Sequence, residues 1–502
     1  MSAPDIKSID YRVKVWLLVA GMLTILALLA AAVRENFLTE WRLHQRAYRD
    51  ILETKATDRQ GQDIRDRFEV RLRQAVVPDL GAIDRCLSCH TGIDDPRMTD
   101  VPQPYKVHPG DILDIHPPER FGCTICHRGQ GAAVTFAEAK AEDYFWDYPL
   151  LPRELTEASC GLCHTPAELE GRGGSRLAEG ARLFEAKGCR GCHQLGGRGG
   201  SIGPVLDNEG LKIKHQLPMA GVDGPHTVPQ WLIEHFRDPQ KIVAGSKMKT
   251  PGLNHDEILA LTTFMLAQQP RDLPRSYLSP AFHAALSLKN RPSDWTGVQL
   301  YAQFCATCHG SGAIGRYDKF YKKFMPAIRS ASFLTVADSS YLANTIRDGR
   351  PGTLMPGWST EKGGLDDSEI ARIIAYLRAG SAETEAVSLS IPPVRLDGGR
   401  AEHGRALYTR LCVGCHAPGG IGDLAPALAN PTFQKYASNE MLYQTIAYGR
   451  RNTAMPAFRA PAAGGLDDAA VIDLIAYLRT LGARTTAPAS PSTAQVTTGM
   501  LP

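Results

Sequence analysis

One five-residue pattern occurs six times in this chain, and no other feature constrains its fold as strongly. The pattern is Cys, two variable residues, Cys and His, and it uses all 12 cysteines. Whatever binds there must need two thiols and an imidazole close together. The pairs are Cys86 and Cys89, Cys123 and Cys126, Cys160 and Cys163, Cys189 and Cys192, Cys305 and Cys308, and Cys412 and Cys415.

Three other uses of paired cysteines are disfavoured by the histidine and by the size of the chain. Disulfide frameworks belong to small, loop-rich domains, not to a chain of 502 residues. A structural zinc ion needs four protein ligands and no histidine after every second cysteine. Thioredoxin-like CxxC motifs lack that histidine as well. CxxCH is the attachment signature of c-type haem, so the sequence predicts six covalently bound c-type haems with their iron.

Each motif histidine is the expected proximal ligand of a haem iron. Two thioether bonds hold the porphyrin, and the adjacent imidazole reaches the iron. A covalently attached haem is not lost, so several haems can pack closely and lie near the surface. The predicted proximal ligands are His90, His127, His164, His193, His309 and His416.

Residues 15–33 form an uncharged apolar stretch between Lys14 and Arg34. A helix of that length crosses a bilayer core. A cleaved signal peptide is the alternative, but the length of the stretch favours a retained anchor. Because c-type haem is attached outside the bacterial inner (cytoplasmic) membrane, we expect a single-pass protein with residues 34–502 in the periplasm.

The second half of the chain contains a repeat. After Cys305 the sequence contains "GRPGTLMPGW" and "GGLDDSEIARIIAYLR", and after Cys412 it contains "GRRNTAMPAF" and "GGLDDAAVIDLIAYLR". Each unit begins with a helix that carries a glycine and an aromatic residue four positions later, and ends in an amphipathic helix. A more divergent third unit surrounds Cys189. The pairs are Gly180 with Phe184, Gly297 with Tyr301, and Gly404 with Tyr408.

These three units resemble the class I cytochrome c domain. In that family the first and last helices cross at a small residue, and a methionine before the last helix is the distal iron ligand. A prolyl carbonyl accepts the proton of the proximal histidine, which fixes its tautomer. The resemblance implies Met248, Met355 and Met455 as distal ligands, and Pro204, Pro326 and Pro426 as the prolines whose carbonyls accept from the proximal histidines. Met219 is a rival to Met248, but it precedes the "WLIEHF" helix.

The first three motifs follow one another at intervals of 37 residues, too closely for a class I fold around each. The stretches between them are rich in proline and turn residues, so the haems themselves are expected to form the core. This resembles compact multihaem cytochromes, whose irons usually carry two histidines. His108 and His116 are the predicted distal ligands, not assigned to particular irons. For the remaining iron, His44, Met98, another subunit and an open position all stay possible.

The predicted architecture is mainly α-helical. It comprises a cytoplasmic N-terminus (1–14), a transmembrane anchor (15–33), a juxtamembrane helical region (34–80), a three-haem segment (81–170), class I cytochrome c domains 1, 2 and 3 (171–270, 294–381 and 397–482) and a disordered tail (483–502). The linkers near 270–295 and 380–399 suggest some domain reorientation. The remaining histidines are expected at surface or helix positions: His215, His226, His235, His255, His283 and His403.

The partner is predicted from resemblance, since charge does not identify one. A net charge of +3 without a basic cluster gives no indication of nucleic acid. Residues 80–270 resemble membrane-anchored multihaem cytochromes that accompany quinol-oxidising cytochrome b and Rieske subunits. Methionine raises the reduction potential of a haem relative to histidine. The resemblance therefore implies an electron-transfer chain from a membrane quinol-oxidising complex to a soluble or terminal acceptor, without catalysis of its own.

Two other functions stay open. The chain could be the donor subunit of a terminal oxidase or a reaction centre. It could also be a haem reductase with an open iron at the third haem, that of His164, although no distal acid and base pair accompanies this motif.

Overall fold

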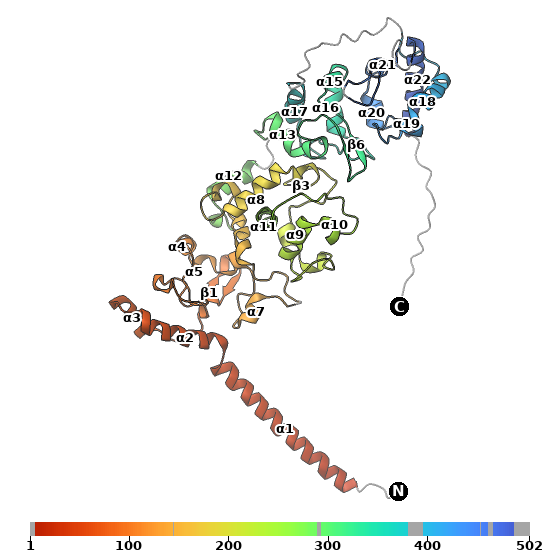
Figure 1. The fold of residues 1–502 in the computed structure, drawn as a ribbon. Helices are drawn as coiled ribbons and strands as arrows, with labels where there is room; N and C mark the ends of the chain where they lie inside the picture. The colour runs from red at the N-terminus through yellow and green to blue at the C-terminus, as the bar shows by residue number, and fades with distance from the viewer. Residues whose placement is uncertain are drawn as a thin grey trace.

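The computed structural model describes residues 6–143, 145–288, 293–379, 395–451, 453–459 and 465–485. A long N-terminal helix extends away from the rest, and helical modules follow it in chain order (Figure 1). The fold is mainly helical, as predicted. In the described ranges the strands form three antiparallel pairs, β1 (Ala75–Val77) with β2 (Ala82–Asp84), β3 (Gln194–Leu195) with β4 (Arg198–Gly199), and β5 (Arg316–Asp318) with β6 (Lys323–Met325).

The N-terminal helix α1 (Ile6–Phe37) is long and apolar enough to cross a membrane. It extends beyond the predicted span of 15–33 at both ends, and its large apolar side chains, such as Trp16 and Leu23, are exposed. Two shorter helices follow, α2 (Glu40–Lys55) and α3 (Arg59–Arg67). The helix α2 is amphipathic and buries Trp41, Tyr48 and Leu52 against the next segment.

The three-haem segment contains only short elements. The 3₁₀ helix η1 (Pro78–Leu80) lies just before it. Besides β2, the segment contains the 3₁₀ helices η2 (Cys86–Ser88), η3 (Pro96–Met98), η4 (Arg153–Leu162) and η5 (Pro166–Leu169), and the α-helices α4 (Ile112–Ile115), α5 (Pro118–Phe121), α6 (Thr124–His127) and α7 (Phe136–Lys140). Its small apolar cluster joins Met98 and Val101 to Tyr48 and Leu52 of α2. This cluster is small, so side chains give the first part of the segment only a minor core of its own.

Domain 1 is built from α8 (Ser175–Ala186), η6 (Cys189–Gly191), η7 (Glu209–Leu211), η8 (Lys214–Gln216), α9 (Val228–Arg237), α10 (Pro239–Ile242) and α11 (His255–Leu266). Its core also includes Leu151, Leu155 and Ala158, from η4 and the residues before it. The three-haem segment and domain 1 therefore share one hydrophobic core, although the sequence analysis treats them as separate units.

Domains 2 and 3 have the same order of helices. Domain 2 contains α13 (Gly297–Phe304), α14 (Ala306–His309), α15 (Ala331–Val336), α16 (Ser339–Asp348) and α17 (Asp367–Ala379), and domain 3 contains α18 (Ala401–Leu411), α19 (Val413–His416), η10 (Pro418–Gly420), α20 (Pro431–Tyr436), α21 (Asn439–Tyr448) and α22 (Asp468–Thr485). One hydrophobic cluster runs through both domains.

The predicted glycine crossings are present in all three domains. A Cβ atom on Gly180, Gly297 or Gly404 would lie 2.0, 2.1 or 1.9 Å from a backbone oxygen of the last helix of its domain. Only a hydrogen fits there, so the first and last helices make backbone contact. Aromatic pairs lie beside the crossings, with ring centres 5.2–5.4 Å apart: Phe184 with Phe264, Tyr301 with Tyr376, and Tyr408 with Tyr477.

The segment after domain 1 is packed against the rest of the chain, which the linker prediction did not anticipate. It contains η9 (Arg275–Tyr277) and α12 (Pro280–Leu288). The Tyr277 ring lies 5.4 Å from that of Phe121, and the Ser279 backbone N–H donates to the Cys163 carbonyl. We call residues 270–288 the strap. Residues 289–292, nearly all of the second predicted linker (380–394) and residues 486–502 of the predicted tail lie outside the described residues. The last helix includes the first three residues of that tail.

Candidate haem-binding sites

The six motifs lie on short helical turns, and none of the 12 cysteines is in a disulfide bond. In every motif the backbone N–H of the histidine donates to the backbone carbonyl of the first cysteine. Both cysteine side chains and the imidazole therefore lie on one turn. Among the described residues, no group of three or more His, Cys, Asp or Glu side chains converges as a metal-ion site would require. This arrangement suits six separate attachment sites and not shared zinc knuckles.

Prolyl carbonyls hold three motif histidines as the class I resemblance predicts. The Nδ1 atoms of His193 and His416 lie 2.9 Å from the carbonyl oxygens of Pro204 and Pro426, and that of His309 lies 3.4 Å from Pro326. The opposite nitrogen of each ring is left for iron. Burial lowers the pKa of these three imidazoles. They are therefore neutral near pH 7 and keep the lone pair that ligation needs.

The structure pairs the two predicted distal histidines with particular motifs. The His108 ring lies 6.3 Å from the His127 ring, and the His116 ring lies 6.1 Å from the His164 ring, centre to centre. Two imidazoles on opposite sides of one iron have centres roughly 6 Å apart, because each metal–nitrogen bond is about 2 Å. These pairs thus fit a haem iron between them. The second pair argues against an open iron at His164.

The first motif is held by α2. Gln45 donates to the Ser88 carbonyl inside the motif, and His44 Nδ1 lies 3.0 Å from the Tyr105 hydroxyl. Met98, one of the open candidates for the distal position, is fully buried among Tyr48 and Leu52. Met98 is therefore explained as a core residue and need not be an iron ligand.

The three predicted distal methionines lie in loops with the same local hydrogen bond. In each loop the methionine N–H donates to a hydroxyl two residues earlier: Met248 to Ser246, Met355 to Thr353 and Met455 to Thr453. The rival Met219 packs against the domain 1 core. The shared loop geometry favours Met248.

Four residues near the motifs make contacts that the sequence did not predict. Buried Asp84 accepts hydrogen bonds from Cys123 N and Thr124 N. Buried Arg128 donates to three groups of domain 1, including the Leu266 carbonyl. Asp84 is separated by 39 residues from the motif it supports, and Arg128 contacts residues up to 141 positions away, so no local pattern could reveal them.

The other two are Glu168 and His235. The Glu168 carboxylate lies 3.0 Å from His164 Nδ1. Burial alone would raise the pKa of Glu168, but hydrogen bonds from Ser279 and Thr165 and the nearby His164 lower it. His235 stacks on Trp231 at 4.5 Å, and burial together with His193 lowers its pKa to about 4. His235 is thus on a helix, as expected, but is no surface residue.

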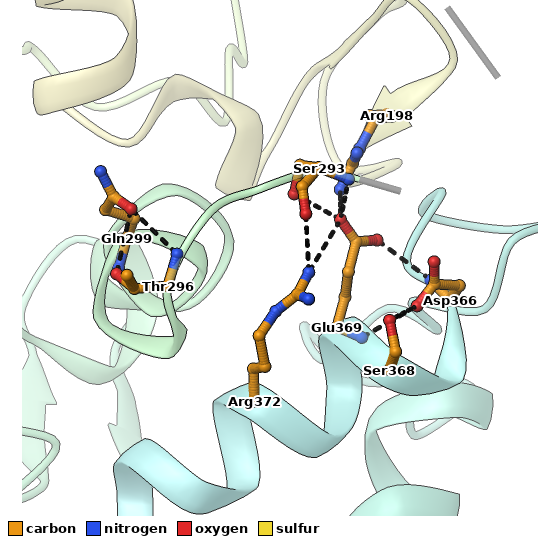
Figure 2. A network of polar contacts seen from close by, with 8 residues as sticks. All are labelled: Arg198, Ser293, Thr296, Gln299, Asp366, Ser368, Glu369 and Arg372. Atoms are coloured by element: carbon orange, nitrogen blue, oxygen red, sulfur yellow. Dashed lines mark hydrogen bonds and ion pairs between the residues drawn. The ribbon is translucent and has the colours of Figure 1, made fainter. Parts of the chain in front are cut away.

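A polar network joins domain 1 to domain 2. Glu369 of α17 is 1% exposed and accepts hydrogen bonds from Arg198 of β4 and from Ser293 (Figure 2). Arg372 lies on the same helix one turn later and donates to the Ser293 carbonyl. Burial by itself would raise the pKa of Glu369, but the bonds from Ser293 and Arg198 lower it. The junction therefore contains a buried, charged and well-paired carboxylate.

Comparisons with known proteins agree with this geometry. A family model described as "Cytochrome C oxidase, cbb3-type, subunit III" matches residues 294–377 and 399–478, and one described as "Cytochrome c" matches residues 177–269. The chain is 28% identical to the cbb3-type cytochrome c oxidase subunit FixP of Bradyrhizobium diazoefficiens over 195 residues, 37% of this chain and 60% of the relative. It is 26% identical to subunit CcoP of Azospirillum brasilense over 202 residues, 37% of this chain and 61% of the relative.

The matched region thus spans about 60% of the length of these curated relatives. A solved chain of the Kuenenia stuttgartiensis reducing HAO-like protein complex Kustc0457/Kustc0458 is 21% identical, covering 38% of this chain and 97% of that chain. Its TM-score of 0.25 is too low to bear on the fold.

The helix crossings, the histidine–proline contacts and the family matches together define this chain as a multihaem c-type cytochrome with an N-terminal membrane anchor. Its cytochrome c domains carry covalently attached haem, whose iron supplies reversible one-electron transfer.

Proposed function

We propose that the chain binds six c-type haems and passes electrons from a membrane-bound quinol-oxidising complex through the three-haem segment to domains 1, 2 and 3. From there they leave to a soluble or terminal acceptor in the periplasm. The main support for this proposal is that the segments that carry successive motifs pack against one another along the chain, which would keep the haems in chain order.

The first three motifs are held together by direct contacts. The side chains of Cys86 and Cys123 lie next to each other. The His127 carbonyl accepts a hydrogen bond from Leu151 N, just before η4, which carries Cys160. The helix η4 in turn packs on α8 and α11 of domain 1. These contacts form one continuous path from the first motif into domain 1.

The motifs of domains 1 and 2 also lie against each other. Thr307, inside the motif of domain 2, donates to the Gly188 carbonyl at 2.7 Å, and a Cβ on Gly191 would lie 3.1 Å from the Thr307 side chain. The hairpin β5–β6 of domain 2 covers the Met248 loop, since Lys249 pairs with Asp318 and Tyr321 donates to the Lys247 carbonyl. These contacts hold the two attachment sites in one fixed arrangement.

Domains 2 and 3 meet across an interface in which equivalent helices of the repeat pack crosswise. Helix α16 packs on α20 and α15 packs on α21, which are matched helices of the repeat. Arg350 lies 5.3 Å from the Phe433 ring, and Arg450 lies 5.1 Å from the Phe333 ring. Both arginines follow directly after the helix that precedes a methionine loop. Each domain thus contacts the other through the residue pair just ahead of its methionine loop, which supports a close approach of the two haems in this proposal.

The predicted ligand classes give the transfer a direction. His108 and His116 would complete bis-histidine sites in the three-haem segment, whereas Met248, Met355 and Met455 would complete histidine–methionine sites in the three domains. Methionine raises the potential relative to histidine. Electrons would then move downhill from the membrane-proximal segment toward domain 3.

A second candidate function differs from this proposal in the complex to which the chain belongs. The curated relatives are named as cbb3-type oxidase subunits, which favours a role as the electron-donating subunit of a terminal oxidase. The family models match domains 1 to 3 and do not include the three-haem segment. We place the quinol-oxidising partner on that segment because its motifs are the ones nearest to the membrane helix in the chain.

Purification of the intact protein from its native membrane tests both candidates. We expect cytochrome b and Rieske polypeptides to accompany it, and recovery of an oxidase core would favour the second candidate. A potentiometric titration with magnetic circular dichroism then tests the ligands. The proposal requires six low-spin haems, with the histidine–methionine group titrating above the bis-histidine group. A methionine-ligated group at the lower potential would contradict the proposed direction.

A further inference from the structure

The third haem motif differs from the others in the partner of its histidine. His193 and His416 contact neutral prolyl carbonyls, whereas His164 Nδ1 lies 3.0 Å from Oε1 of Glu168. A carboxylate is an acceptor with a full negative charge, and it forms a stronger hydrogen bond than a neutral carbonyl does. The imidazole of the third motif therefore has an anionic partner.

Glu168 is fixed from several directions. Its Oε1 atom also accepts hydrogen bonds from the Thr165 N–H at 2.7 Å and from the Ser279 hydroxyl at 2.6 Å. Ser279 belongs to the strap and begins α12, where its hydroxyl also accepts from Phe282 N. The Glu168 side chain is 19% exposed. The strap thus closes over the carboxylate and holds it against the third motif.

We propose that Glu168 is a positioning residue that sets the potential of the third haem and makes it the lowest of the three-haem segment. The inference rests on the proposed function, which places a haem at His164. A hydrogen-bonded anion raises the basicity of a ligating imidazole. A more basic ligand stabilises ferric over ferrous iron, so the third haem is the last of the three to accept an electron as the potential is lowered.

A purely structural role for Glu168 makes a different prediction. Glu168 also completes a capping box with Thr165 at the start of η5, and that role alone would leave the potential unchanged once the fold is kept. Glu168→Gln separates the two, because glutamine keeps the shape and can still bond the backbone but removes the charge.

The matched control is Glu157→Gln. Glu157 lies three residues before Cys160, and its carboxylate accepts hydrogen bonds from Arg176 N and Leu177 N, not from a motif histidine. It therefore reports the effect of a lost negative charge near the same motif without the imidazole bond.

The experiment is a potentiometric titration of the full-length protein, with haem number from intact mass and ligand class from magnetic circular dichroism. In Glu168→Gln we expect one bis-histidine haem to shift upward in potential while six haems and all low-spin signatures remain. The shift in Glu157→Gln should be smaller. Unchanged potentials in Glu168→Gln with six haems bound would overturn the inference, as would equal shifts in the two variants.

A second variant should shift the reduction potential of the same haem in the opposite direction. Ser279→Ala removes a donor that competes with His164 for the same Glu168 oxygen, so the remaining bond strengthens and the same haem should shift downward. An upward or absent shift would contradict the inference, and this variant keeps the test decisive if Glu168→Gln does not fold. Absence of a haem at Cys160 and Cys163 in the wild-type mass would instead contradict the proposed function.

Discussion

The three-haem segment and the pair formed by domains 2 and 3 differ in how many apolar side chains they bury in a core of their own. The pair buries a continuous apolar cluster that includes Leu300, Tyr301, Tyr408 and Val471. The segment buries only Met98 and Val101 in its own apolar cluster, and it borrows Tyr48 and Leu52 from α2. Burial of apolar side chains is the main favourable term in folding. Other buried residues of the segment, such as Leu151 and Leu155, belong to the core shared with domain 1. The comparison teaches that the segment has little side-chain core of its own and, under the proposed function, would depend on its haems for one.

The largest expected effect comes from removing one haem attachment site in each region. Replacing Cys123 and Cys126 by serine should cost the segment more than one haem and expose it to protease, because the second motif contacts the first and third. Replacing Cys412 and Cys415 by serine should remove a single haem. Intact mass and limited proteolysis measure both. Loss of only one haem in the first variant would contradict a core made of haems.

A smaller effect is expected at a helix crossing of domain 3. Gly404→Val adds a side chain where even a Cβ atom would lie only 1.9 Å from the Asp473 carbonyl oxygen. Overpacking of this kind should lower the free energy of unfolding of domain 3 by about 3 kcal/mol, measured by denaturant titration. Gly398→Ala is the control, since nothing lies within 4 Å of its Cβ position and it lies outside the haem motif. If both variants unfold at the same denaturant concentration, the side-chain core is not what holds this domain.

The junction between domains 1 and 2 depends on one buried carboxylate. Glu369→Gln should destabilise it by about 2 kcal/mol, seen as earlier separation of the domains in hydrogen exchange. The control is Asp367→Asn, whose ion pair with Arg347 involves a side chain that is 80% exposed and should contribute under about 1 kcal/mol.

The same carboxylate predicts a pH dependence. Because its folded pKa lies below its ordinary value, its stabilisation is fully present above the unfolded pKa and is lost as the pH falls below about 4. Hydrogen exchange at the junction of the wild-type protein should increase over that range, and Glu369→Gln should show less of this increase. An equal increase in both would assign the acid effect to other groups.

The smallest effect is expected for a single hydrogen bond between domains 2 and 3. The Tyr436 hydroxyl donates to the Asp348 carboxylate at 2.5 Å. Tyr436→Phe should lower the free energy of unfolding of the pair by about 1 kcal/mol, because the apolar interface around it remains. A loss as large as that of Gly404→Val would mean that polar contacts, and not the shared core, hold the pair together.

The sequence by itself determined the attachment chemistry and the local design of domains 1, 2 and 3. Six CxxCH motifs, the glycines Gly180, Gly297 and Gly404 and the prolines that face the motif histidines are all readable, because each acts within a short or repeated stretch. Only the tertiary structure decided that His108 faces His127, that His116 faces His164, and that Asp84 and Ser279 support motifs far from them in the sequence. Those contacts arise where distant segments pack together, and their spacing leaves no periodic or repeated signal along the chain.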